Sequence, residues 1–170
     1  MIIGFLCLIA GCGGGGGGGP VTPSDEITQV GTYDEIPDDF SLIYDFRDQN
    51  AQPPYRLVLT FLKSGSINYE KYVVSGSGFT SDTEDSLLIP NDVLLLYNYM
   101  VSKGFFALEN LYMTPDQSKP ITNIDITTKS KEMMVEYHPC QDCTVDDLPP
   151  VFNEITAYIL NMAAKYLDKM

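Results

Sequence analysis

Residues 55–74 read YRLVLTFLKSGSINYEKYVV, and this stretch decides the fold because two runs of strand length flank a short turn. The first run alternates, and its apolar members are Tyr55, Leu57, Leu59 and Phe61. Side chains two residues apart share one face of a strand, so this run predicts a half-buried strand. Residues 63–66, Lys-Ser-Gly-Ser, favour a turn into a second strand over Ile67–Val74. The stretch therefore predicts a β-hairpin.

The same alternation occurs on both sides of this hairpin. Upstream, one face of a predicted strand carries Phe40, Leu42, Tyr44 and Phe46, and its other face carries Ser41, Asp45 and Arg47. Downstream, a second hairpin with its turn at residues 129–131 has the apolar positions Ile124, Ile126, Met133, Val135 and Tyr137. The segment Ser75–Ser86 is rich in Ser, Gly, Thr and Asp with little periodicity, and is predicted to be a long loop.

Two segments have helical periodicity. The first begins at Ile89-Pro90-Asn91-Asp92 and ends at Lys103 and Gly104, with the apolar positions Val93, Leu96, Tyr97, Met100 and Val101. The second begins at Asp146, Asp147 and Pro149-Pro150, with Val151, Ile155, Tyr158, Ile159, Met162 and Tyr166, and with Lys165 and Lys169 at its negative end. The order strand, hairpin, helix, hairpin, helix predicts an α+β fold, in which two helices pack on one face of a two-layer antiparallel sheet.

Charge and composition exclude some functions. The chain has 170 residues, with 23 Asp and Glu against 10 Lys and Arg, which gives a net charge of −13. Phosphate binding needs clustered Lys and Arg, so nucleic acid is excluded as a main partner. The continuous apolar run Ile2–Ala10 is about half of the ~20 residues that a membrane-spanning helix needs.

The amino terminus ends its apolar run on small residues directly before a cysteine: Ile9-Ala10-Gly11-Cys12. This pattern resembles the cleavage box of a bacterial lipoprotein signal, and the resemblance implies cleavage before Cys12 and lipidation of that residue. The segment departs from the family in having no Lys or Arg ahead of the apolar run, which leaves open whether the start codon lies upstream. The alternatives are an ordinary secretory peptide and a buried core segment.

Seven glycines, residues 13–19, and the following Pro20-Val21-Thr22-Pro23-Ser24 predict a flexible tether, because they offer little apolar surface to bury. We therefore divide the chain into a signal peptide at 1–11, a lipidated cysteine and tether at 12–37, and one α+β domain at 38–170. The residue after the cysteine is Gly13 and not Asp, and the lipoprotein resemblance therefore implies an anchor in the outer membrane of a two-membrane cell.

The domain itself has a weaker resemblance. The segment Gly104–Leu108 reads GFFAL and precedes Tyr112, Asp116, two predicted strands and the Leu148-Pro149-Pro150 that opens the last helix. This layout resembles small secreted domains of unknown function and is similar to emfourin-type inhibitors of secreted metalloproteases. It contains no catalytic signature. The alternative role for Phe105, Phe106 and Leu108 is core packing after a helix C-cap.

The cysteines favour a disulfide. Cys7 would leave with the signal and Cys12 would carry lipid, which leaves Cys140 and Cys143 in an oxidising compartment. A redox-active Cys-x-x-Cys is an alternative, although the nearby acids disfavour a thiolate. Zinc bound by His138, Cys140 and Cys143 is another, although a structural site needs four ligands.

Nothing in the chain forms a recognisable catalytic set. His138 is the sole histidine and no nucleophile motif accompanies it, and the acidic clusters lack the spacing of a calcium loop. Eleven tyrosines suit a protein-binding surface or a core without tryptophan. We therefore expect a non-enzymatic protein-interaction domain of the cell envelope, with no cofactor and no metal, and with an unidentified protein as its partner. The alternative is a metalloprotease inhibitor.

The lipid assignment predicts the behaviour of the Cys12→Ser variant. We expect it to lose incorporation of labelled fatty acid and to leave the membrane fraction, because acyl chains on this residue would be the anchor. Fractionation of cells that express either form checks this expectation, and a Cys12→Ser protein that stays in the membrane fraction would contradict it.

Overall fold

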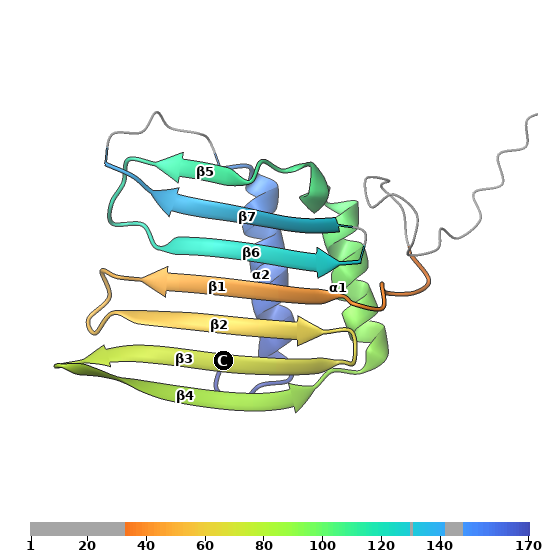
Figure 1. The fold of residues 1–170 in the computed structure, drawn as a ribbon, viewed down its shortest axis with the longest axis horizontal. Coiled ribbons are helices and arrows are strands. Elements are labelled where there is room, and N and C mark those ends of the chain that lie inside the picture. Colours follow the sequence, from red (N-terminus) through yellow and green to blue (C-terminus); the bar gives the residue numbers. More distant parts are fainter. Residues whose placement is uncertain (1–32, 130, 142–147) are drawn as a thin grey trace, which may run out of the picture.

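The computed structural model describes residues 33–129, 131–141 and 148–170, which form one sheet and a pair of helices (Figure 1). In chain order the elements are β1 (Ser41–Asp48), β2 (Tyr55–Leu62), β3 (Ser66–Ser75), β4 (Gly78–Leu87), α1 (Pro90–Ser102), the short 3-10 helix η1 (Phe105–Ala107), β5 (Leu111–Thr114), β6 (Ile121–Thr128), β7 (Lys131–Pro139) and α2 (Pro150–Ala164). The predicted α+β class is confirmed.

The sheet has seven strands in the order β4-β3-β2-β1-β6-β7-β5. Neighbouring strands are antiparallel except for β5, which is parallel to β7. The prediction of a wholly antiparallel sheet is therefore wrong at this edge. The reason is that the β6–β7 hairpin inserts between β1 and β5, so that β5 lies beyond β7 and runs in the same direction.

Two rows of apolar side chains cross the middle five strands on one face of the sheet. The first row is Ile67, Phe61, Leu42, Ile126 and Met133, and the second is Tyr69, Leu59, Tyr44, Ile124 and Val135. All ten side chains are buried. The alternation in the sequence predicted these faces, and the burial confirms it because residues of equal parity stay on one side of a pleated sheet.

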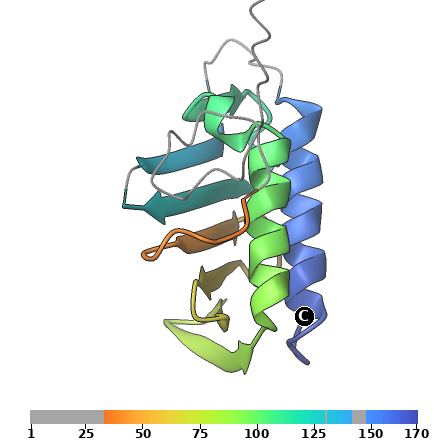
Figure 2. The same ribbon diagram turned by 90° about the vertical axis from the view of Figure 1, so that its right-hand side faces the viewer.

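Both helices lie on the same side of the sheet and run side by side (Figure 2). They are antiparallel, because Asp92 at the start of α1 accepts hydrogen bonds from Lys165 and Tyr166 at the end of α2, and Lys103 pairs with Glu154. The Tyr99 and Tyr158 rings stack between them with 3.9 Å between centroids. The predicted core positions of α1 are all buried. Among the residues described, no helix has the length and apolar character needed to span a membrane.

The segment predicted to be a long loop, Ser75–Ser86, is mostly strand. Its first residues complete β3 and make the turn, and β4 then pairs with β3 from Gly78 to Leu87. Nearly every side chain of β4 is exposed, so the sequence has no apolar alternation here. The strand forms because β3 supplies a backbone template for it, and this long ladder does not depend on an apolar face.

Residues outside the strands and the two long helices complete the core. Phe105 and Phe106 form η1 after Gly104, whose φ of 73° makes the turn at the end of α1, and both rings are buried. The core-packing role is therefore confirmed for these two phenylalanines. Tyr33 and Ile36, upstream of the expected boundary at residue 38, also belong to the core. A test fragment should therefore start before Tyr33.

The β2–β3 turn is predicted to favour glycine strongly at position 65. Its φ is +87°, and a Cβ at this position would lie 2.7 Å from the Leu88 carbonyl oxygen. Its own carbonyl accepts the Leu88 amide at 2.8 Å, so the two backbones cannot separate easily. We expect Gly65→Ala to lower the free energy of unfolding by roughly 2–3 kcal/mol, from a positive φ and a close contact together.

Gly76→Ala is the matched control, because Gly76 has a φ of +57° with nothing within 4 Å of a Cβ. It should cost about 1–2 kcal/mol, from the positive φ alone. Urea denaturation of both variants measures the difference, and equal losses would show that the approach to Leu88 has no energetic weight.

Candidate functional site

The described part of the chain includes only some of the site residues that the sequence predicts. Cys12 and Cys143 lie outside the described residues. Cys140 directly follows β7, and its amide donates to the Thr114 carbonyl at 2.7 Å. Its pairing with Cys143 remains a prediction.

His138 lies on β7, two residues after Glu136 on the same face of the strand. Its Nε2 atom is 4.0 Å from Glu136 Oε1, and both side chains are partly exposed. Within residues 33–129, 131–141 and 148–170, no group of three His, Cys, Asp or Glu side chains is placed to hold a metal ion. The zinc set that includes Cys143 cannot be assembled from these residues alone.

The centre of the open face, the side of the sheet away from the helices, carries an ion cluster. Asp45 on β1 accepts hydrogen bonds from Arg47 at 3.3 and 2.6 Å and from Arg56 on β2 at 2.9 and 2.9 Å. These are the two arginines of the chain. Each presents its guanidinium edge to both carboxylate oxygens, which is the strongest geometry for such a pair. The cluster links β1 to β2 across the open face.

The arginines cover Asp45, so that this aspartate is only 6% exposed although it lies on the open face. Burial raises the pKa of Asp45, but the hydrogen bonds and charges of Arg56 and Arg47 outweigh it and hold the pKa below its usual value. Asp45 and Arg47 were placed on one face by the sequence, whereas Arg56 was missed. The alternation with Tyr55 and Leu57 indicates that Arg56 lies on the polar face of its strand. Its position diagonally across from Asp45 depends on the β1–β2 register, which the sequence analysis did not predict.

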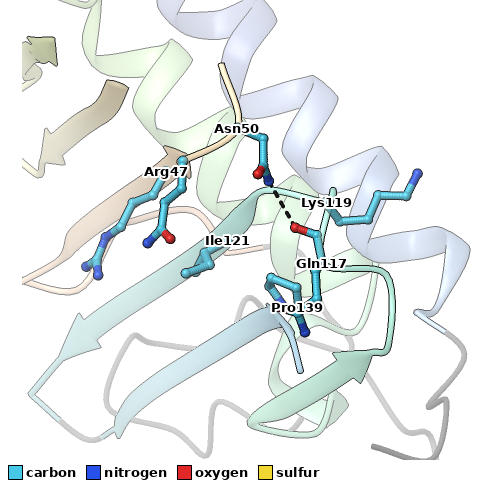
Figure 3. A pocket seen from close by; sticks show the side chains of 7 residues that line it. Arg47, Asn50, Gln117, Lys119, Ile121 and Pro139 are labelled. Atoms are coloured by element: carbon cyan, nitrogen blue, oxygen red, sulfur yellow. Dashed lines mark hydrogen bonds between the residues drawn. The ribbon is translucent and has the colours of Figure 1, made fainter. Parts of the chain in front are cut away.

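A pocket of about 200 Å³ lies where β1 and β6 meet the loops at the end of the sheet (Figure 3). Its lining is Arg47, Gln49, Asn50, Gln117, Lys119, Ile121 and Pro139. Asn50 Nδ2 donates to the Gln117 carbonyl at 2.9 Å, which ties the β1–β2 loop to the β5–β6 loop. The lining contains two cations and no acid, so this pocket differs in charge from the chain as a whole.

A second cavity, of about 390 Å³, lies between the sheet and α2. Four aromatic rings line it, those of Tyr44, Phe46, Tyr137 and Phe152, together with the Thr156 side chain. Thr156 Oγ1 is buried without a hydrogen-bond partner. Lys119 borders both this cavity and the pocket at the sheet end. The cavity has the size and the mixed lining of a small-molecule site.

Large apolar side chains are exposed mainly on the open face. By strand parity this face carries Ile43, Leu62, Val74, Phe79, Leu87, Leu111 and Met134, each at least 36% exposed. Phe79 and Leu87 on β4 are the most exposed, at 70% and 72%. The Tyr72 ring packs edge-on against Phe79 with 6.1 Å between centroids. On the helix side most apolar residues are buried. The open face therefore exposes more apolar side chains to a possible partner than the helix side does.

Comparison with known proteins adds no assignment. No protein-family model matches the chain, and no curated protein matches it.

The ion cluster predicts a defined effect of acid. The folded-state pKa of Asp45 is lowered, so its stabilisation is fully present above the unfolded pKa of ~3.9 and is lost as the pH falls through the folded value. Asp45→Asn should remove this part of the pH dependence and cost roughly 1–3 kcal/mol at pH 7.

Asp38→Asn is the control, because Asp38 pairs with Lys63 while remaining 93% exposed. Its cost at pH 7 should be much smaller than that of Asp45→Asn, because solvent screens an exposed ion pair. Urea denaturation from pH 2.5 to 7 measures both variants. An Asp45→Asn curve that runs parallel to that of the wild type would contradict the predicted pH dependence, and one that coincides with it would show that the cluster contributes nothing.

Proposed function

We propose that this chain is a lipid-anchored protein of the bacterial cell envelope, and that its two-layer domain binds another protein through the open face of the sheet. The observation that carries the proposal is the placement of the exposed apolar residues. Of the ten large exposed apolar side chains in the described part of the chain, seven lie at strand positions that face away from the helices, among them Leu62, Val74 and Phe79. Exposed apolar groups with polar neighbours are typical of protein-binding surfaces.

The ion cluster supports this use of the face. Asp45 and its two arginines hold the centre of the face rigid, so that a partner meets a preformed surface and loses less entropy on binding. The arginine side chains are 41% and 47% exposed and can still make contacts. Arginine is also one of the residues enriched at protein interfaces.

The lipid anchor predicted from the sequence also supports the proposal. Lipid on Cys12 would hold the chain at the outer membrane, and the glycine-rich tether up to residue 37 would let the open face turn toward a neighbour. The proposal assigns the domain no catalytic residue and no cofactor. Its partner is another envelope or secreted protein.

A comparison of surface variants tests the proposal. The Leu62→Ser, Val74→Ser double variant removes two apolar groups from the open face, and Leu95→Ser removes one of similar exposure from α1. We use the chain from residue 12 onward with Cys12→Ser, which keeps Tyr33 and its hydrogen bond from the amide to Asn98 Oδ1. Surface changes of this kind usually alter stability by no more than about 0.5 kcal/mol each, so folding should be kept.

We expect envelope proteins cross-linked to the parent and to Leu95→Ser to be lost from the double variant, as measured by quantitative mass spectrometry. Equal recovery from all three forms would contradict the proposal. If the protein recovered is a secreted metalloprotease, and if its activity falls in proportion to the added chain, the inhibitor function is supported in place of a scaffold.

A further inference from the structure

Strand β4 forms one edge of the sheet and pairs with β3 alone among the strands described (Figure 1). It is ten residues long and almost wholly exposed. The opposite edge, β5, has four residues. A long open edge offers a row of backbone donors and acceptors to another strand, so β4 is the edge on which strand addition can occur.

The register shows which backbone groups are offered. The Leu88 amide donates to the Gly65 carbonyl at 2.8 Å, so the residues of β4 with the same parity as Leu88 direct their backbone groups toward β3. The alternate residues direct theirs to the free edge, and these are Phe79, Ser81, Thr83, Asp85 and Leu87. Their side chains lie on the open face, so an added strand would extend that face.

The charge on β4 opposes pairing between two copies of this chain. Antiparallel pairing of two β4 strands about Thr83 would bring Asp82 of each opposite Glu84 of the other. Like charges directly opposite one another destabilise a strand pair. Each chain also carries a net charge of −13, which adds to the repulsion.

The same charge favours a cationic partner, and the chain's own carboxyl end already shows this preference. Lys169 Nζ forms an ion pair with Asp82 and donates to the Thr83 carbonyl at 2.8 Å. The Asp168 and Lys169 amides donate to Glu84 at 3.0 and 3.1 Å. A cation from elsewhere in the chain therefore occupies the middle of the edge.

We infer that β4 accepts an extended, lysine- or arginine-bearing segment of a partner protein as an eighth strand. This inference rests on the proposed function and names the chemistry of its partner. Cations of the segment would face Asp82, Glu84 and Asp85, and its apolar residues would contact Phe79 and Leu87 at the two ends. Lys169 competes for the Thr83 carbonyl, so the incoming strand displaces it.

The probe is the nine-residue peptide Val-Thr-Lys-Lys-Val-Lys-Thr-Thr-Val, which in antiparallel pairing places its lysines opposite Asp85, Glu84 and Asp82. Two control peptides accompany it, one with glutamate for each lysine and one with proline for the central valine. The proline peptide keeps the charge but cannot complete the ladder.

Binding to the chain from residue 12 onward with Cys12→Ser is measured by isothermal titration at low salt. We expect both controls to bind at least about tenfold more weakly, the glutamate peptide through repulsion and the proline peptide through the lost ladder.

Two matched variants of the protein locate the contact. Thr83→Pro removes one outward amide without touching the pairing with β3, whereas Thr83→Val keeps that amide. We expect the first to weaken peptide binding about tenfold or more and the second to leave it within about twofold. Lys169→Met should strengthen binding severalfold, because it frees the Thr83 carbonyl and leaves Asp82 without its cation.

Equal binding of the parent and proline peptides, or equal binding by Thr83→Pro and Thr83→Val, would show simple charge attraction and overturn the inference. A dimer of the chain in sedimentation would overturn it in favour of a second copy. If Thr83→Pro still captures the envelope partner that the Leu62→Ser, Val74→Ser variant loses, the inference fails while the proposed function stands. If neither variant changes capture, the proposed function itself fails.

Discussion

Burial of Leu42 and Tyr44 at the middle of the sheet is the constraint on which the rest of the structure depends. Their strand, β1, is where the strands that precede α1 meet those that follow it, because β1 pairs with β2 on one side and β6 on the other. Leu42 is wholly buried and Tyr44 is 2% exposed. Each such side chain contributes on the order of 1.5–3 kcal/mol, so the two halves of the sheet cannot separate without a large loss.

This constraint also determines what the opposite face can do. The parity that directs Leu42 and Tyr44 toward the helices directs Ile43 and Asp45 away from them. The Asp45 carboxylate would be costly to bury alone, and the two arginines satisfy it without a covering layer. Among the residues described, this face therefore has no covering layer, and the long edge strand β4 is an extension of it.

Most of the core could be predicted from the sequence, because alternation and helical spacing are local signals. The faces of β1, β2 and β6 and the buried side of α1 are examples. The strand β4 could not be predicted, since its exposed residues carry no apolar period and a local pattern does not show its pairing with β3. β5 is four residues long and pairs with a strand that comes later in the chain, which no local pattern records. In the candidate site, Asp45 and Arg47 share a strand and could be placed together, whereas Lys119 reaches its pockets from a loop. The lipid anchor and the cysteine pairing depend on Cys12 and Cys143, which lie outside the described residues.

The central claim is that one continuous sheet is built on β1 and ends in an open edge at β4. Native-state hydrogen exchange of the chain tests this claim most directly. The account predicts that the amides joining β1 to β2 and to β6 exchange slowest and only through global unfolding, at one common free energy. It predicts that the outward amides of Ser81 and Asp85 exchange with little protection. Exchange of the β1–β6 amides through a separate, less costly opening, or protection of the outward β4 amides equal to that of β1, would contradict it.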